Sequence, residues 1–336
     1  MGGRGCGRPS NCARQRRMEL ASSASFEAEV APHRRALLSY CYRMLGSWSD
    51  AEDAVQEALV RAWKGLAGFE GRSQLRSWLF QIATRTCLDL IAQRKRRHLP
   101  DEVHPAATLG DAPTADPLHD YLEPAPASAL DLEPGPETVV SRRESVALAF
   151  MVTLQALPGT QRAALVLKDV LGFSAEETAQ QLESTVPAVN SLLQRARASL
   201  DEASPRWKRR AGEEKERELL GRYLRVWESS DVSGLVSLLR EDATLTMPPM
   251  GLWFSGAANV IGFYRAAFFG PGVEAGRYRA VPVEAAGHLA LAISTRKTPG
   301  GPWEPVALQL VEAEGDRLVH LVAWVDPVLT ARFLKA

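Results

Sequence analysis

Apolar residues recur every three or four positions in the first third of the chain, and this spacing predicts helices with one buried face each. The first helix is expected to end at Gly46. The run from Ser49 to Glu52 has the form of a capping box, which would begin a second helix. A third helix is expected from near Ser73 and would run into the basic residues 94–97. Together they predict an all-α domain over residues 26–98.

The helical spacing returns in residues 138–203. One helix is expected over Val139–Leu157, and Thr160 is expected to cap the next. Ser174-x-x-Glu177 has capping-box spacing and would begin a short helix, which a turn separates from a longer one over residues 186–200. Two such helices joined by a tight turn predict a helix–turn–helix.

The period changes in residues 213–336, where helical spacing gives way to strand-like runs separated by glycine and proline turns. This order predicts a separate α+β domain. The helices are expected over residues 213–227, 232–239 and 257–269, and the strands over 277–284, 289–296, 306–312 and 318–325.

Two stretches lack such periodicity. Residues 99–137 contain eight prolines and nine acidic residues with no lysine or arginine among them, which predicts an extended acidic linker. Residues 1–25 are expected to be a disordered tail, with Met18 as an alternative start. No hydrophobic signal segment follows the basic residues of the tail, so no export signal is expected.

Composition narrows the class of protein. The chain has 336 residues, 46% of them hydrophobic and 24% charged, which fits two or three globular domains. Cys41 and Cys87 lie in helical patterns and are expected in the core, whereas Cys6 and Cys12 lie in the tail without partners at zinc-site spacing. No apolar run is long enough to cross a membrane. We therefore expect a cytoplasmic protein with no cofactor, metal site or catalytic residues.

The formal net charge of zero hides a strong segregation of charge along the chain. Basic residues between Arg72 and Arg97 are interleaved with Trp78 and Phe80, an arrangement suited to phosphates and unstacked bases. Taken alone, a solvated basic face with Trp78 in the core explains the same pattern. The helix over residues 50–57 presents an acidic face, which suits a basic protein partner but is also compatible with simple solvation.

The second helix of the predicted helix–turn–helix carries small polar residues at its start, which suit base edges in the major groove. Arg195 and Arg197 further along suit phosphates, which position a protein on DNA without specifying sequence. An ordinary helical hairpin with a polar, solvent-exposed face is the alternative.

These motifs, in their order and spacing, resemble the extracytoplasmic-function (ECF) sigma factors over residues 26–203. The segment Asp50-Ala51-Glu52-Asp53-Ala54-Val55-Gln56-Glu57 resembles their core-polymerase-binding region. The segment Ser77-Trp78-Leu79-Phe80-Gln81-Ile82-Ala83, followed by Cys87-Leu88-Asp89, is similar to their −10 region. Gly172-Phe173-Ser174-Ala175-Glu176-Glu177-Thr178-Ala179 and Val189-x-x-Leu192-x-x-Arg195-Ala196-Arg197 resemble their −35 region.

The resemblance implies three sets of site residues. The clamp helices of the polymerase large subunit would meet Asp50, Glu52, Asp53, Gln56 and Glu57. The non-template strand of the −10 element would meet Arg72, Ser73, Gln74, Arg76, Ser77, Trp78, Gln81, Thr84 and Arg85. The −35 major groove would meet Thr185, Pro187, Ala188, Asn190, Ser191, Gln194, Arg195 and Arg197.

The implied partners are core RNA polymerase, through its clamp helices and flap, and promoter DNA. A separate anti-sigma factor is left open. The acidic linker would thread the polymerase near its RNA exit path, and Tyr121-Leu122-Glu123-Pro124 within it resembles a short motif of one sigma subgroup that has a C-terminal extension.

Residues 213–336 resemble the SnoaL-like domains of the NTF2-like fold, through Ala243–Pro249 and Trp253-Phe254-Ser255-Gly256. The chain is thus expected to be multi-domain, with two all-α sigma domains and a C-terminal α+β cone that regulates them. Candidate residues for lining the cone are Trp253, Tyr264, His288 and Trp324. An isomerase-like enzyme with a fused DNA-binding head, and a repressor or activator that binds duplex DNA without polymerase, are the alternatives.

Overall fold

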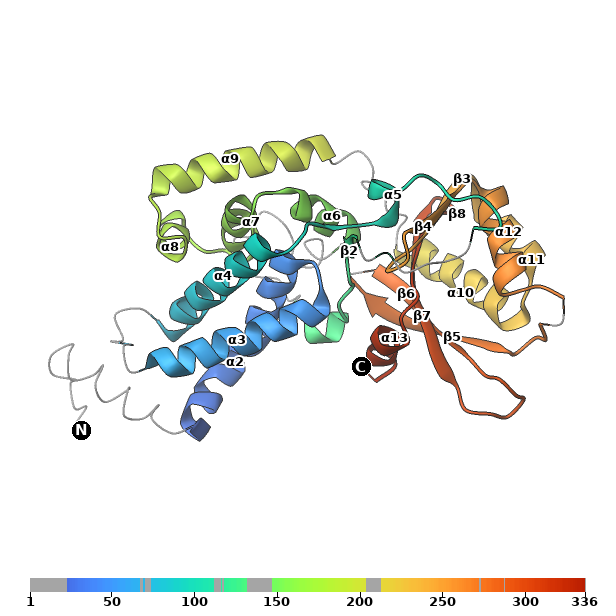
Figure 1. The fold of residues 1–336 in the computed structure, drawn as a ribbon, viewed down its shortest axis with the longest axis horizontal. Coiled ribbons are helices and arrows are strands. Elements are labelled where there is room, and N and C mark those ends of the chain that lie inside the picture. The colour runs from blue at the N-terminus through green and yellow to red at the C-terminus, as the bar shows by residue number, and fades with distance from the viewer. Residues whose placement is uncertain are drawn as a thin grey trace, which may run out of the picture. The chain divides into compact units, whose positions relative to one another are not determined.

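The computed structural model divides into two compact units (Figure 1). The first takes in the chain up to Arg94, residues 129–145 and residues 153–202, and the second takes in the rest. The residues that the structure describes are 23–66, 69, 74–111, 116, 118–131, 147–203, 213–271, 273–286 and 288–335.

Three helices form the N-terminal part of the first unit: α2 (Ser23–Leu45), α3 (Trp48–Gly65) and α4 (Leu75–Gln93). Gly46 ends α2 as predicted, in the left-handed conformation (φ 71°) that glycine adopts without strain. The predicted capping box at Ser49 is wrong. Ser47 caps α3 instead, and its hydroxyl accepts a hydrogen bond from the Asp50 amide at 3.2 Å. The apolar side chain of Trp48 is buried in the first turn and shifts the start of α3 by two residues.

The rest of the first unit holds the predicted helix–turn–helix. It contains α7 (Gly159–Leu165), a π-helical turn η4 (Val166–Val170), α8 (Ala175–Gln181) and nearly all of α9 (Val186–Ala203). The boundary between the units falls within α6 (Leu148–Ala156), at residue 153. The capping box of α8 is confirmed, since Ser174 and Glu177 exchange hydrogen bonds of 3.0 and 2.7 Å. The predicted cap at Thr160 is wrong, because Pro158 is the N-cap residue and α7 therefore begins two residues earlier than predicted.

Arg162 joins the two helical parts of this unit. Its guanidinium is buried and donates to Gln155 Oε1 (2.6 Å), to the carbonyl of Leu157 (3.1 Å) and to the carbonyl of Met44 at the end of α2. Nearby, the rings of Phe80 and Phe173 pack with centroids 5.4 Å apart. Hydrogen bonds from a buried guanidinium are directional, so they fix the two helical parts together more specifically than apolar contact alone.

The second unit is built on a mixed six-stranded sheet in the order β4-β3-β8-β7-β6-β5. The strands are β3 (Leu239–Met247), β4 (Leu252–Ser255), β5 (Tyr278–Ala285), β6 (His288–Thr295), β7 (Glu304–Glu314) and β8 (Arg317–Trp324). The helices are α10 (Glu213–Ser229), α11 (Val232–Leu238), α12 (Ala257–Ala267) and α13 (Pro327–Lys335). Figure 1 shows α10, α11 and α12 on one side of the sheet and α13 on the other. This is the predicted α+β domain, with β3, β4 and α13 in addition.

The segment of residues 95–128, called here the linker segment, differs from the extended chain that its composition predicts. It contains β1 (Arg97–His98), α5 (Pro100–Val103) and β2 (Asp120–Tyr121), and β1 pairs with β2 in parallel. The short 3-10 helix η2 (Ala127–Ala129) begins at its end. A few buried apolar side chains explain the difference, since Leu99, Leu122 and Ala125 are all at most 2% exposed.

The linker segment belongs to the same unit as the sheet domain and is hydrogen-bonded to it. Trp253 Nε1 donates to the His104 carbonyl (2.8 Å), and Trp324 Nε1 donates to the Leu122 carbonyl (2.6 Å). The Ala286 amide donates to the Ala125 carbonyl at 3.1 Å. The acidic, proline-rich composition therefore does not keep these residues extended, because backbone carbonyls and a few apolar side chains attach them to a folded surface.

The interior of the sheet domain holds a polar triad of Tyr223, Tyr264 and Gln309. The Tyr223 hydroxyl lies 2.7 Å from both the Tyr264 hydroxyl and Gln309 Oε1, and Gln309 Nε2 donates to the Tyr264 hydroxyl at 2.5 Å. Burial raises the pKa of Tyr264 to about 12. The three side chains satisfy one another, as buried polar groups must.

No helix within the described ranges is both long enough and apolar enough to cross a membrane.

Candidate nucleic-acid and polymerase interfaces

The acidic face of α3 lies opposite its buried face, as the helical period dictates. Ala51, Ala54, Val55 and Ala58 point into the core, and the predicted polymerase-binding residues lie on the other side. Asp53, Gln56 and Glu57 are exposed, and Glu52 is half-buried. Asp50 pairs with Arg94 from the basic run after α4.

Arg61 neutralises part of this face. It bonds to Glu57 at 2.8 Å one turn earlier and to Asp89 of α4 at 2.9 Å. The acidic residues of α3 outside this bridge include the exposed Asp53 and the half-buried Glu52, both in the first half of the helix.

The predicted −10 residues on α4 do not all lie on the surface. Thr84 is fully buried, bonded to the Tyr40 hydroxyl (2.9 Å) and to the Phe80 carbonyl (2.7 Å), so it belongs to the core. Trp78 packs against Phe69 in a tilted arrangement with ring centroids 4.7 Å apart and is half-buried. Gln74 is exposed just before α4, and Arg72 and Ser73 lie outside the described residues.

The remaining predicted −10 residues contact the helix–turn–helix part of the same unit. The Ser77 carbonyl accepts from Gln181 Nε2 at 3.0 Å, Gln81 lies 3.5 Å from Glu183, and Arg85 forms an ion pair with Glu183. The guanidinium of Arg76 lies over the Phe173 ring, 4.5 Å from its centroid. The end of α8 and its turn therefore cover part of the α4 surface.

The sequence motifs singled out neither Gln181 nor Glu183 for this contact. Glu183 adopts a positive φ of 50° in the turn between α8 and α9, which points to a special position, but a carboxylate in a turn is too common to be informative from sequence.

The −35 candidates on α9 form one exposed face. Val189, Leu193 and Ala196 are buried below it. The exposed members of the predicted set are Thr185, Pro187, Ala188, Asn190, Ser191, Gln194, Arg195 and Arg197.

Arg197 differs from its neighbour Arg195. Its Nε and Nη2 atoms donate to the two oxygens of Asp169 at 2.8 and 2.6 Å, and the Asp169 side chain is only 2% exposed. This bidentate pair fastens α9 to η4 and raises the pKa of Arg197. Arg195 has an exposed side chain on the same helix and is the better candidate for a phosphate contact.

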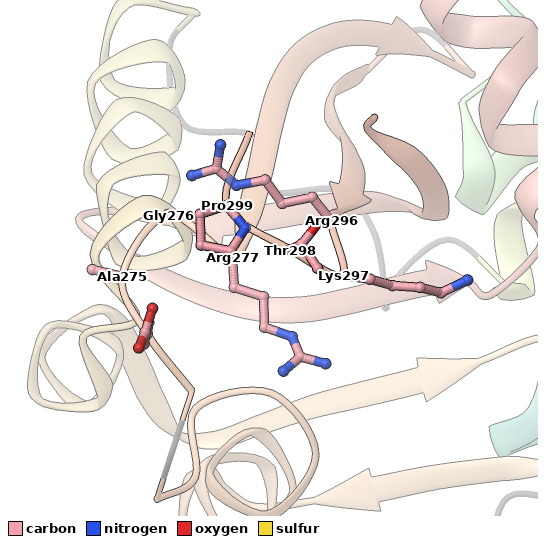
Figure 2. A pocket seen from close by; sticks show the side chains of 8 residues that line it. Ala275, Gly276, Arg277, Arg296, Lys297, Thr298 and Pro299 are labelled. Atoms are coloured by element: carbon pink, nitrogen blue, oxygen red, sulfur yellow. The ribbon is translucent and has the colours of Figure 1, made fainter. Parts of the chain in front are cut away.

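The four residues predicted to line a cavity in the sheet domain have separate environments. Tyr264 belongs to the interior triad, Trp253 and Trp324 hold the linker segment, and His288 begins β6. A hollow of about 310 Å³ elsewhere in the domain is lined by two loops, at residues 274–277 and 296–299. Figure 2 shows the basic side chains of Arg277, Arg296 and Lys297 around it.

Comparison with known proteins agrees with these features. Residues 30–97 match the family described as Sigma-70 region 2, and residues 147–200 match the family described as Sigma-70, region 4. The ECF RNA polymerase sigma factor SigG of Mycobacterium tuberculosis is 40% identical over 319 residues, which cover 92% of this chain and 83% of SigG. The chain therefore belongs to the ECF RNA polymerase sigma factors.

More distant relatives cover different shares of the molecule. The RNA polymerase sigma-H factor of Pseudomonas aeruginosa is 29% identical over 187 residues, or 56% of this chain and 90% of that protein. The crystal structure of the Mycobacterium tuberculosis sigma factor SigJ shares the fold over 92% of this chain and 98% of its own, with a TM-score of 0.54 and 23% identity. SigG and SigJ thus extend across the third domain, whereas the sigma-H factor matches only about half of the chain.

Proposed function

We propose that three helices of this sigma factor carry its three binding functions. The acidic face of α3 binds the clamp helices of core RNA polymerase, the surface of α4 from Gln74 to Arg85 holds the −10 element, and α9 enters the −35 major groove. The polymerase flap contacts the region that carries α9. The chain carries out this work in the cytoplasm.

The observation that supports this most is the separation of charge between the helices. Asp53 and Glu57 are exposed on α3, where carboxylates would repel phosphates. Asn190, Gln194 and Arg195 are exposed on α9, where amides can read base edges and the guanidinium can bind a phosphate. A helix face that repels DNA beside two that suit it is what a protein bridging polymerase and promoter requires.

Charge reversal on α3 tests the assignment. Asp53→Arg combined with Glu52→Arg should weaken binding to purified core polymerase at least tenfold, because complementary charges would become repulsive. Fluorescence anisotropy with labelled full-length chain gives the affinity. Glu228→Arg, an exposed reversal on α10, is the matched control and should leave core affinity unchanged. Equal affinity of the Glu52/Asp53 variant and the native chain would refute the role of α3.

The contact between α4 and the turn after α8 supports a closed state of the free chain. Ser77, Gln81 and Arg85 cannot meet DNA fully while Gln181 and Glu183 cover them. Binding to core polymerase would separate the two parts and uncover the −10 surface, so promoter contact would depend on polymerase.

The third domain acts as a regulator in cis rather than as an enzyme. Its interior polar groups Tyr223, Tyr264 and Gln309 are committed to one another, which favours a structural role for them. Its Trp253 and Trp324 hold the segment that joins the two sigma regions, so a change in this domain would reach the promoter-binding parts through that segment. Turnover of a small hydrophobic substrate, lost on changing interior residues, would favour the isomerase-like alternative instead.

A further inference from the structure

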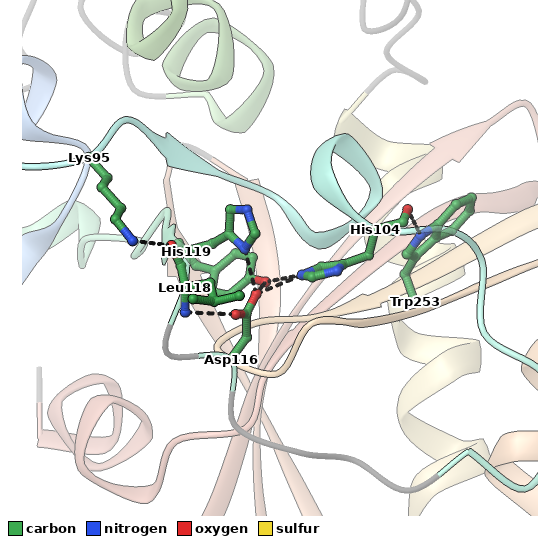
Figure 3. A network of polar contacts seen from close by, with 7 residues as sticks. Lys95, His104, Asp116, Leu118, His119 and Trp253 are labelled. Atoms are coloured by element: carbon green, nitrogen blue, oxygen red, sulfur yellow. Dashed lines mark hydrogen bonds and ion pairs between the residues drawn. The ribbon is translucent and has the colours of Figure 1, made fainter.

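Three of the six histidines in the chain, His98, His104 and His119, lie in the linker segment within a span of 22 residues. The side chains of His104 and His119 converge on one carboxylate. His104 Nε2 lies 2.6 Å and His119 Nδ1 lies 2.9 Å from Oδ2 of Asp116. Figure 3 shows His104 and His119 pointing toward Asp116. The Tyr121 hydroxyl donates to the same oxygen at 2.5 Å and lies 3.0 Å from His104 Nε2.

The cluster is held in place by its surroundings. The Leu118 amide donates to Asp116 Oδ1 at 2.9 Å, and Trp253 holds the backbone of His104 from β4. The imidazole of His104 lies so close to Gly251 that a Cβ there would be 2.6 Å from Nε2, so a larger residue at this position would displace the imidazole.

We propose that His104, Asp116 and His119 form a binding site for a divalent transition-metal ion of the zinc class. The three ligand atoms lie within 4.8 Å of one another, which is the convergence that a metal needs. Two imidazoles and one carboxylate suit zinc and its neighbours rather than calcium or magnesium, which prefer oxygen ligands alone.

Only small movements separate the present geometry from a metal site. Ligand atoms about 2.1 Å from a tetrahedral ion stand about 3.4 Å apart, so the hydrogen-bonded atoms must spread by less than 1 Å. The side chains of His104 and His119 are 26% and 30% exposed, which leaves room for this movement and for entry of an ion. Asp116 is 8% exposed, and the Tyr121 hydroxyl would keep its hydrogen bond and orient the carboxylate.

A bound ion would cross-link the two ends of residues 104–119 next to β4 and would keep the linker segment folded. Because a ligand that binds only the folded form stabilises it, metal would shift the linker segment away from an open state. This inference concerns a new site and does not depend on the roles proposed for α3, α4 and α9.

Zinc chloride titrated calorimetrically into the tag-free, metal-stripped full-length chain tests the site. All measurements use the Cys6→Ser/Cys12→Ser variant, so that thiols of the N-terminal tail contribute nothing. We expect one equivalent of Zn²⁺ to bind, and His104→Gln/His119→Gln to weaken binding at least about 100-fold, since both nitrogen ligands are lost. Gln at these partly exposed positions retains hydrogen bonding and should preserve the fold, which circular dichroism verifies. His33→Gln on α2 is the matched control and should bind as the parent does.

Hydrogen–deuterium exchange of peptides within residues 98–125 gives a second readout. Zinc should slow exchange there in the parent chain and have no such effect in the His104/His119 variant. The proposal is overturned if the parent binds no zinc, if the double variant binds as tightly as the parent, or if zinc leaves exchange in this segment unchanged.

Discussion

Arg195 and Arg197 lie on the same helix, yet their surroundings give them different roles. Arg197 uses its guanidinium to pair with both oxygens of the buried Asp169, whereas Arg195 is exposed on the face proposed to meet DNA. The sequence could not distinguish them, because the partner of Arg197 lies 28 residues away on η4.

Arg195→Ala should therefore weaken DNA affinity and lower the slope of log affinity against log salt concentration by about one, because one phosphate contact is lost. Binding of the chain with core polymerase to promoter DNA, measured at several salt concentrations, gives this slope. An unchanged slope would show that Arg195 does not reach a phosphate.

Arg197→Ala should mainly affect stability. Asp169 would stay buried without its partner, at a cost to the free energy of unfolding of about 1–3 kcal/mol once the half-exposed guanidinium is allowed for. Urea unfolding followed by circular dichroism measures the change. Equal stability of the variant and the native chain, with a lowered salt slope, would reverse the roles assigned to the two arginines.

Gln309 is another residue whose role only the structure reveals. Gln309→Leu should lower the free energy of unfolding by about 2 kcal/mol, since a tyrosine hydroxyl of the interior triad would lose a partner. Trp227 packs against Tyr264 with ring centroids 5.6 Å apart, so the triad borders the aromatic core of this domain. Thermal unfolding of the full chain followed by circular dichroism measures the change. An unaltered transition would show that the triad adds nothing to stability.

Among the elements, the turn between α8 and α9 has two roles: it connects the two helices of the helix–turn–helix, and it contacts the surface of α4. Glu183 contacts Gln81 and Arg85 from this turn, and Gln181 contacts Ser77. Exposed ion pairs of this kind add little stability, so the contact can break when a stronger partner competes.

Glu183→Ala should raise the affinity of the free chain for −10 single-stranded DNA several-fold, because Arg85 and Gln81 would be released. Gln180→Ala, an exposed change on α8, is the matched control. Anisotropy with a labelled non-template oligonucleotide measures the affinity. If both variants bind as the native chain does, the turn does not restrict access to α4.

Most elements could be predicted from periodicity, because helices and strands with one buried face repeat their apolar residues. The four strands from β5 to β8 follow this rule, and the capping box of α8 could be predicted from the spacing of Ser174 and Glu177. β3 and β4 were missed because Thr246-Met247-Pro248-Pro249 interrupts the alternation. The family resemblance places Thr84 among the −10 residues, and only the structure shows its buried bond to Tyr40.

At the scale of the whole chain, the linker segment is part of the second unit and not a free connection. Composition predicted an extended chain, but Leu99, Leu122 and Ala125 are buried and Trp324 holds the Leu122 carbonyl. These anchors are too few and too irregularly spaced to form a periodic signal, so sequence analysis could not detect them.

Deleting residues 213–336 should consequently expose the linker segment. Trypsin should cut at Lys95–Arg97 much faster in the truncated chain than in the full chain, because the partners of the segment are gone. Trp324→Phe, which removes one hydrogen bond, should give an intermediate rate. Equal cleavage rates in all three chains would show that the third domain does not hold the segment.

As an ECF sigma factor, the chain directs core RNA polymerase to specific promoters. Transcription in vitro from genomic DNA, with purified core polymerase and with or without the full-length chain, tests it most directly when the 5′ ends of the transcripts are sequenced. With the chain present, we expect new start sites that share −10 and −35 elements and that disappear with the Glu52→Arg/Asp53→Arg variant. The same start sites with and without the chain, or start sites with no shared upstream sequence, would contradict it.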